Sequence, residues 1–467
     1  MKKARKICAL LGVLLVICVA AFVISRQEEE KENIRNSDAV ILAIDGESVT
    51  ALSWEYGETS LAFHKDGKWL YDEDEAFPVN EEKIGDLLEQ FGEFAVSFEI
   101  EDVEDISRYG LDAPVCTIRI AAGEQEYEIL LGTYSTMDEE RYVSIGDGKV
   151  YLVSHDPLEE YEVELRDMIK QDEIPGLSDA TAIQFAGTQN YEILYEEESP
   201  NTYCPDDVYF TEGQPLDSTL VGAYLNTVDG VGLNEYVSYN VTEEELAEYG
   251  LDNPDLTITV NYPVETEEEA TVTETFVLHL GRNQEELEAA LETGDENEIY
   301  SVSAYARVGN SPIVYEITSL EYRNLTKNSC QDLRHKEVLT ASFEDIYQID
   351  ITLEGVDYTF TSAETEEGKV IWHYREDEEL NISSLKSAIR ALAAADAESF
   401  TEEEPAGKEE ISFTVYLNRE NHPQIKVQLY RCDGEDCLAV VDGKTVSRVP
   451  RSDVVDLTEE VNRIVLN

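Results

Sequence analysis

The apolar residues of this chain follow two periods, and the two periods alternate along the sequence. Three segments carry apolar residues at offsets 0, 3, 4 and 7, the spacing of an amphipathic helix: 84–91, 221–228 and 385–392. Other runs, such as 115–120 and 256–260, alternate apolar and polar residues, as strands with one buried face do. The pattern therefore predicts an α+β fold, made of tandem repeats of antiparallel β-sheet with one amphipathic helix in each repeat.

A residue that can cap a helix stands four positions before each apolar face. These residues are Asn80, Asp217 and Asn381. The side-chain oxygen of Asn or Asp accepts a hydrogen bond from a free N–H in the first helical turn. We therefore expect the three helices to begin just after these residues.

A six-residue motif occurs twice, 140 positions apart, with five identical residues. Its residue types are those of a helix stop: Gly adopts the left-handed conformation, Leu packs back on the last turn, Asp makes a local turn and Pro starts a strand. A ligand site around Asp112 and Asp252 is the alternative, but caps and turns account for every residue type in the motif. The motif residues are Tyr109, Gly110, Leu111, Asp112 and Pro114 in the first copy and Tyr249, Gly250, Leu251, Asp252 and Pro254 in the second.

These signals divide the chain into five parts. The third repeat has lost the motif and carries residues 402–407, Glu-Glu-Glu-Pro-Ala-Gly, in its place. The expected parts are a basic start with a membrane anchor at 1–26, an acidic stalk at 27–38, and repeat units at 39–173, 174–329 and 330–467.

The anchor is expected because four basic residues precede an apolar run of 18 residues, Ile7–Ile24. As a helix, this run would be about 27 Å long, which just spans a bilayer. The excess of positive charge before it predicts a cytoplasmic N-terminus and an extracellular ectodomain. A cleaved signal peptide is the alternative, although its apolar region is usually shorter.

The charge of the chain excludes one class of partner. With 34 Lys and Arg against 101 Asp and Glu, the formal net charge is −67, which would repel a nucleic-acid backbone. A basic protein surface is the partner that this charge favours. The many carboxylate clusters lack the spacing of a calcium loop, so they predict solvated surface, with weak binding of divalent cations as the alternative.

The sequence offers no recognisable catalytic, cofactor-binding or metal-binding motif. The six histidines are scattered singly, so we expect no metal centre and no cofactor. Cys432 and Cys437 bracket a four-residue turn, and a disulfide between them is predicted if they face each other across a hairpin.

Gly67-Lys68-Trp69 and the two copies of the turn motif, together with a basic start, an apolar run and an acidic β-rich region, resemble the bacterial envelope proteins grouped as domain of unknown function 4340. The resemblance implies an accessory role near an ABC-type export permease and supplies no catalytic residue. We therefore expect a membrane-anchored extracytoplasmic binding or scaffold protein rather than an enzyme. The alternative is an anchored cell-wall glycan hydrolase whose carboxylate pair the sequence does not identify.

Overall fold

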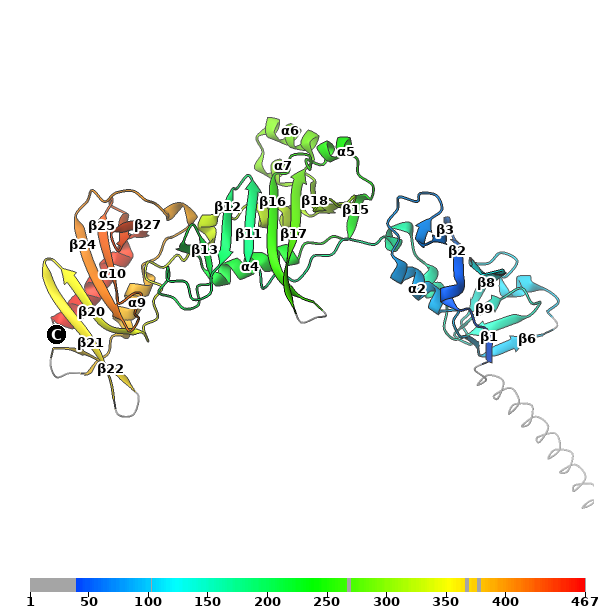
Figure 1. Ribbon diagram of the computed structural model, residues 1–467, viewed down its shortest axis with the longest axis horizontal. Helices are drawn as coiled ribbons and strands as arrows, with labels where there is room; N and C mark the ends of the chain where they lie inside the picture. The colour runs from blue at the N-terminus through cyan, green and yellow to red at the C-terminus, as the bar shows by residue number, and fades with distance from the viewer. Residues whose placement is uncertain (1–38, 102, 267–269, 366–368, 376–378, 467) are drawn as a thin grey trace, which may run out of the picture. The chain divides into compact units, whose positions relative to one another are not determined.

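The computed structural model describes residues 39–101, 103–266, 270–365, 369–375 and 379–466. These residues form two compact units, and the boundary falls between Gln171 and Asp172. The first unit contains one large sheet and a two-stranded sheet, and the second unit contains two large sheets (Figure 1).

The large sheet of the first unit has the strand order β4-β3-β2-β7-β8-β9-β10-β6, and β1 pairs separately with β5. All of these pairs are antiparallel. The elements are β1 (Ala39–Leu42), η1 (Gly46–Ser48), β2 (Val49–Tyr56), β3 (Thr59–Asp66), β4 (Lys68–Tyr71), α2 (Glu81–Glu89), β5 (Phe94–Val96), β6 (Phe98–Ile100), η2 (Ile106–Tyr109), β7 (Cys116–Ala122), β8 (Gln125–Ser135), β9 (Glu140–Ser144), β10 (Val150–Val153), α3 (Leu158–Tyr161) and η3 (Leu165–Met168).

The second large sheet has the order β14-β13-β12-β11-β16-β17-β18-β19-β15. Its elements are β11 (Ala182–Gly187), β12 (Tyr191–Tyr195), β13 (Tyr209–Thr211), β14 (Gln214–Pro215), α4 (Ser218–Asp229), β15 (Glu235–Ser238), α5 (Glu243–Glu248), β16 (Leu256–Glu265), β17 (Thr271–Arg282), α6 (Gln284–Thr293), α7 (Glu296–Tyr300), β18 (Ala304–Val308), β19 (Val314–Ile317), α8 (Ser319–Thr326) and η4 (Cys330–Leu333).

The third large sheet has the order β23-β22-β21-β20-β24-β25-β26-β27. Its elements are β20 (Ile346–Leu353), β21 (Val356–Glu364), β22 (Val370–Tyr374), β23 (Glu379–Leu380), α9 (Ser383–Ala391), η5 (Ala397–Ser399), β24 (Glu409–Leu417), β25 (Gln424–Arg431), β26 (Asp436–Val441), β27 (Lys444–Pro450) and α10 (Arg451–Val465).

The three large sheets share one path of the chain. The first strand of each sheet pairs with the next strand in sequence and, on its other side, with a strand that follows the first long helix. The central pairs are β2 with β7, β11 with β16, and β20 with β24. The chain thus builds the same antiparallel arrangement three times.

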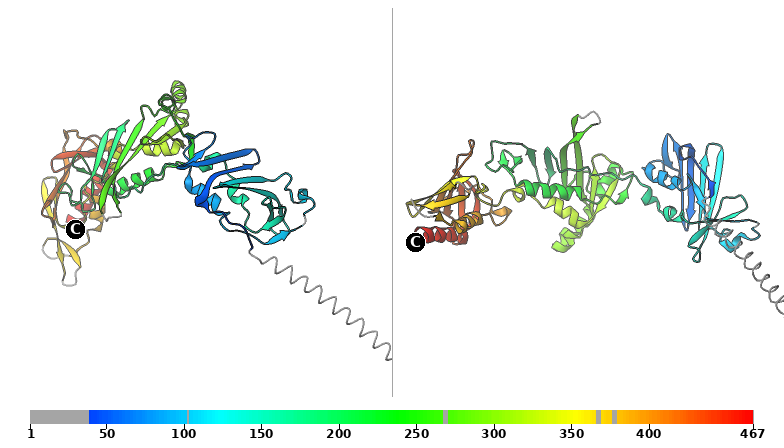
Figure 2. Two further views of the ribbon diagram at one scale, coloured as in Figure 1. Left: turned by 45° about the vertical axis from the view of Figure 1, so that its right-hand side comes forward. Right: turned by 90° about the horizontal axis from the view of Figure 1, so that it is seen from below.

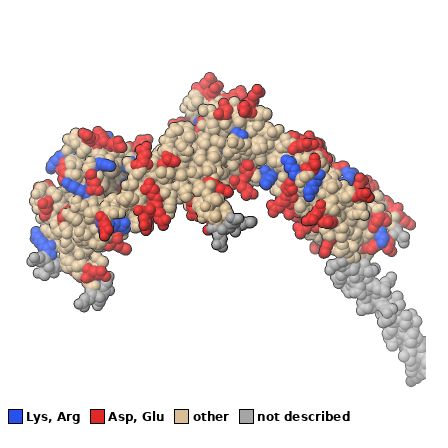
Figure 3. All heavy atoms as spheres, in the orientation of Figure 1, with Lys and Arg blue, Asp and Glu red and all other residues tan. Residues whose placement is uncertain are grey.

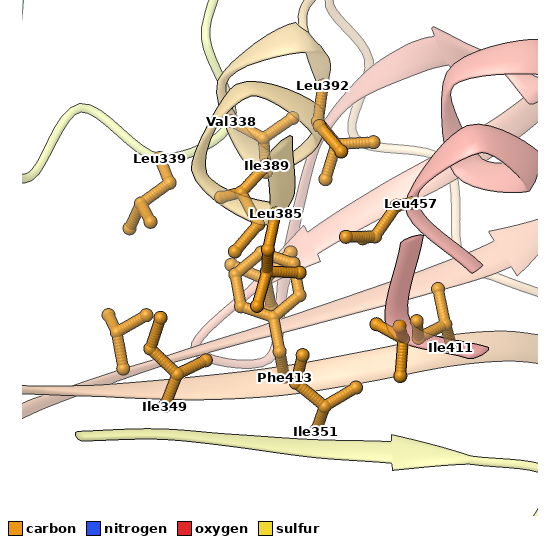
Figure 4. Close-up of a cluster of buried hydrophobic side chains, with 14 of the residues drawn as sticks. Val338, Leu339, Ile349, Ile351, Leu385, Ile389, Leu392, Ile411, Phe413 and Leu457 are labelled. Atoms are coloured by element: carbon orange, nitrogen blue, oxygen red, sulfur yellow. The ribbon is translucent and has the colours of Figure 1, made fainter. Parts of the chain in front are cut away.

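Helices cover one face of each large sheet. In the first sheet, Trp54 on β2 meets the ring of Tyr161 from α3 edge to face, with centroids 5.5 Å apart. In the second, Phe185 on β11 contacts Tyr224 of α4, with centroids 5.4 Å apart. In the third, Leu385 and Ile389 of α9 and Leu457 of α10 pack on the strands (Figure 4). Figure 2 shows these helices on one side of the second and third sheets.

The predicted fold class is wrong in two respects. The structure is mostly β, with 39% strand and 23% helix. The described residues form four sheets, and each of the three large sheets has more than one α-helix in its part of the chain. Among the helices of the described residues, none is long and apolar enough to cross a membrane, so the predicted transmembrane helix has no support there. The residues expected to form the anchor, 1–26, and the stalk, 27–38, lie outside the described part.

The predicted helix starts are confirmed at two of three positions. The side chains of Asn80 and Asp217 each accept two backbone N–H bonds at the start of α2 and α4. Asn381 accepts the N–H of Ser383, but the N-cap residue of α9 is Ile382. The first turn of α9 is therefore shifted by one residue from the expected start.

Candidate functional site

The repeated motif ends a short helical segment in both copies. Gly110 and Gly250 are in the left-handed region, with φ of 68° and 66°. The N–H of the following Leu donates to the carbonyl five residues earlier in the chain, from Leu111 to Ile106 and from Leu251 to Leu246. Both leucines are buried. In the first copy the segment is the single 3₁₀ turn η2 instead of an α-helix.

The motif tyrosines pack on the sheets. The ring of Tyr109 lies 4.9 Å from that of Tyr142 on β9, and the ring of Tyr249 lies 4.8 Å from that of Tyr305 on β18. Asp112 and Asp252 are exposed, and neither lines the pocket described below. The tyrosines and leucines of the motif therefore take part in packing, and among the described residues neither aspartate belongs to a group of side chains that could hold a metal ion.

The first unit contains a buried ion pair that the sequence did not reveal. Arg141 on β9 donates to Asp156 over 2.6 Å and to the carbonyl of Gly132 over 2.7 Å. Asp156 also accepts the N–H of Leu158. Both charged residues are less than 10% exposed. The pair therefore joins β9 to the start of α3.

A pocket of about 530 Å³ lies within the second unit, where the loop between β12 and β13 faces the turn between β24 and β25. His422 from this turn donates from Nε2 to the carbonyl of Pro200 over 2.9 Å. Tyr203 packs against the core of the third sheet, and burial raises the pKa of its hydroxyl. The pocket is lined by Tyr195, Glu197, Glu198, Ser199, Thr202, Cys204, Pro205, Asp207, Val208, Arg419, Glu420, Asn421 and His422.

Asp207 is the most buried carboxylate of the pocket, and it is fully engaged. It is 4% exposed, and its two oxygens accept bonds from His335 Nε2 and from the Thr202 hydroxyl, each over 2.7 Å. His335 lies just after η4, 128 residues from Asp207. No local spacing in the sequence could have paired these two residues.

The face of each sheet opposite the helices is partly exposed, and the three faces differ in charge. On this face, three residues that are neighbours across three adjacent strands form a central row. In the first sheet the row contains Arg119, whose guanidinium bonds to two carboxylates. In the third sheet the row contains the carboxylate of Asp350 and the ammonium group of Lys426. The central row of the second sheet carries no charge. The rows, which occupy equivalent positions on the strands, are Ser53, Arg119 and Glu128; Gln184, Thr259 and Val277; and Asp350, Thr414 and Lys426.

The uncharged face of the second sheet extends to the rows on either side. They contain Ala182, Asn261 and Thr275, and Ala186, Thr257 and His279. Burial lowers the pKa of His279, and the nearby Arg307 acts in the same direction. α5 and the second copy of the motif cover the neighbouring strands β18 and β19 on this side, through Leu246, Leu251, Tyr305 and Val314. In Figure 3 the surface over β11, β16 and β17 is largely free of charged atoms, whereas acidic side chains surround it.

The predicted disulfide is not formed. Cys432 and Cys437 are both free thiols. Cys437 on β26 is opposite Arg431 on β25, and the N–H of Cys432 donates to the carbonyl of Asp436. The two cysteines are therefore offset by one position across the hairpin, and adjacent strand positions face opposite sides. Within the described residues, no group of three or more His, Cys, Asp and Glu side chains is arranged to hold a metal ion.

Comparison with known protein families gives one match, and it covers well over half of the chain. Residues 69–199 and 210–411 match the family described as a domain of unknown function, DUF4340. The first region runs from β4 to just beyond β12, so it leaves out β2 and β3 of the first sheet, and the other runs from β13 to β24. No curated protein matches the chain.

Proposed function

Because the chain belongs to the DUF4340 family, whose description assigns no activity, we propose from its geometry that it is a binding or scaffold protein without catalytic activity. Its partner is a protein of an export or envelope system outside the cytoplasm. The observation that carries the proposal is the uncharged face of the second sheet, centred on Gln184, Thr259 and Val277.

This face has the composition of an interface centre. Interface centres are depleted of charged residues, and their rims are polar. Thr257, Thr259 and Asn261 supply hydrogen-bonding groups, and Ala182 and Val277 supply apolar contact. Since equivalent rows of the other two sheets contain Arg119 and Lys426 with their neighbouring carboxylates, the absence of charge is not a consequence of the fold itself.

The acidic surround defines the partner's chemistry. Glu192 lies beside the face on β12, opposite Gln184, and the first turn of α6 contains Glu285 and Glu286. A partner that matches this surface has an uncharged centre with a basic rim. Complementary charge at a rim speeds association and is screened by salt, so binding is fast at low ionic strength and weakens as salt rises.

The test is site-specific photo-cross-linking in the native host. A cross-linking amino acid at Thr259 is compared with one at Thr414, the equivalent position of the third sheet. We expect one protein to be cross-linked from Thr259 and not from Thr414. The purified partner should then bind the full chain, and Thr259→Asp should weaken binding at least tenfold while Thr414→Asp changes it less than twofold. Equal cross-linking from both positions, or binding that Thr259→Asp leaves intact, would contradict the proposal.

A further inference from the structure

His335 is held between two carboxylates that belong to the second sheet's part of the chain. Its Nε2 lies 2.7 Å from Asp207, which is on the loop before β13. Its Nδ1 lies 3.8 Å from Asp217, the N-cap of α4. The imidazole side chain is 19% exposed, and the Asp207 side chain is 3% exposed.

The backbone that follows His335 is bound to the third sheet's part of the chain. Glu337 forms an isolated β-bridge with Ala393, just after α9. The N–H of Val338 donates to Leu392, and the N–H of Ala394 donates to Lys336. His335 therefore connects the helix start and loop of the second sheet to a segment that is fixed on the third.

The geometry suits the doubly protonated ring. A neutral histidine carries one N–H, so it can donate to only one of two facing carboxylates. Burial by itself lowers the pKa of His335, but the hydrogen bond and charge of Asp207, with the charges of Asp217 and Glu337, outweigh it and raise the pKa. Arg334, the preceding residue, has its guanidinium 4.2 Å from the centre of the Phe400 ring. The charged groups that act most strongly on the ring are therefore negative.

Loss of the Nδ1 proton would leave the Nε2–H free to donate to Asp207 but would remove the positive charge that faces Asp207 and Asp217. Asp207 would keep its hydrogen bonds from the ring and from the Thr202 hydroxyl, but it would lose the charge that balances it in a site that is almost closed to water. A buried charge without a partner is costly, so the contact weakens. A histidine whose pKa is raised in the folded state stabilises it fully below about pH 6.5, and the contribution disappears as the pH rises through the raised pKa.

We propose that His335 is a pH-sensitive latch between the second and third sheets. In its imidazolium form it bridges Asp207 and Asp217 and keeps the junction closed, and at alkaline pH it releases the loop 199–208 from the segment 334–338. If closing the junction raises the pKa of His335 by one unit, protonation of the ring raises the ratio of closed to open junction tenfold.

The test measures hydrogen exchange of the full chain by mass spectrometry at pH 6 and pH 9, corrected for the intrinsic dependence of exchange on pH. We expect protection of residues 199–208 and 334–338 to fall at pH 9 and to be unchanged in β16 and β24. His335→Gln should show the lower protection at both pH values. The matched control is His279→Gln, because the ring of His279 bonds to the hydroxyl of Thr257 and its pKa is lowered by burial instead of raised; this variant should keep the pH dependence of exchange of the unmodified chain.

A second measurement keeps the proposal testable if His335→Gln does not fold. The ring of His335 is titrated by NMR in the unmodified chain, and its midpoint should lie above 6.5 and coincide with the loss of protection. A midpoint at or below 6.5, or protection that is the same at pH 6 and pH 9, would overturn the latch.

Discussion

Gly132 lies against the carbonyl oxygen of Tyr109 so closely that a methyl group on Gly132 would be 2.2 Å from that oxygen. The second repeat has the same contact, because a methyl group on Gly281 would be 2.6 Å from the carbonyl oxygen of Tyr249. Each copy of the turn motif is thus seated on a strand glycine, and the backbone of the turn approaches β8 or β17 directly. The third repeat has a similar close approach with the roles exchanged. There the glycine, Gly407, belongs to the segment that replaces the motif, and the carbonyl belongs to Arg431 on the strand β25.

We predict that Gly132→Ala destabilises the first unit by about 1–3 kcal/mol, because the backbone of the turn must move. Gly85→Ala is the matched control. Gly85 is exposed within α2, nothing lies within 4 Å of an added methyl group, and the change should stabilise the helix by about 1 kcal/mol. Urea unfolding followed by tryptophan fluorescence measures both, since Trp54 and Trp69 report on this unit. Similar effects of the two changes would contradict the close contact.

The ion pair of Arg141 and Asp156 predicts a strong effect of removing one charge. Asp156→Asn should destabilise the first unit by about 3–5 kcal/mol, because it leaves the guanidinium buried without a compensating charge. Glu55→Gln, which removes one partner of the exposed Arg119, should cost less than about 1 kcal/mol. The same unfolding measurement compares them. Equal losses would show that the Arg141 site is open to solvent.

The free cysteines predict an order of chemical reactivity. Burial raises the pKa of Cys116 to about 12 and that of Cys437 to about 11, and both side chains are closed to solvent. Because the thiolate is the reacting species, both should be alkylated by iodoacetamide at pH 8 far more slowly than Cys432. Mass spectrometry of the native chain gives the rates. A disulfide-linked peptide containing Cys432 and Cys437 would contradict the observed hairpin.

Asp229, the last residue of α4, predicts a gain of stability on acidification. Burial raises the pKa of its carboxyl group, and the N–H of Leu177 opposes the shift only partly. The folded state therefore binds the proton more tightly, so this contribution is present below the ordinary value of 3.8 and is lost as the pH rises through the raised pKa. Asp229→Asn should stabilise the second unit at pH 7 by about 0.3–1 kcal/mol, since a negative charge at a helix C-terminus is also unfavourable.

Glu245 provides the control of opposite sign. Its pKa is lowered by the backbone and side-chain hydrogen bonds of Thr242 in the capping box of α5. It stabilises the folded state above its ordinary value of 4.5, and this contribution is lost as the pH falls through the lowered pKa. Thermal unfolding between pH 3 and pH 7 should show that Glu245→Ala is destabilising at pH 7 and less so at pH 3. If the stability of Asp229→Asn depended on pH in the same way as that of the unmodified chain, Asp229 would not be a group whose raised pKa affects stability.

The features that the sequence predicted well are those that depend on neighbours along the chain. The helical faces around Leu87, Leu225 and Ile389 are buried as their spacing indicates, and Asn80 and Asp217 cap their helices. α10 was missed although Val454, Leu457 and Val461 carry a similar signal. Residues three or four apart meet on one side of a helix whatever the rest of the chain does, so periodicity is sufficient to find them.

What the tertiary structure alone decided is which distant residues meet. The contact of Gly132 with Tyr109, the pairing of His335 with Asp207, and the one-position offset of Cys432 and Cys437 all depend on strand register and on packing between segments far apart in sequence. Register moves a side chain to the opposite face when it shifts by one residue, and it is set by the whole buried face of a sheet. The sequence by itself determined three amphipathic helices, the caps of two of them and the acidic charge, whereas the uncharged face around Thr259 and the junction at His335 exist only because folding aligned their strands and loops.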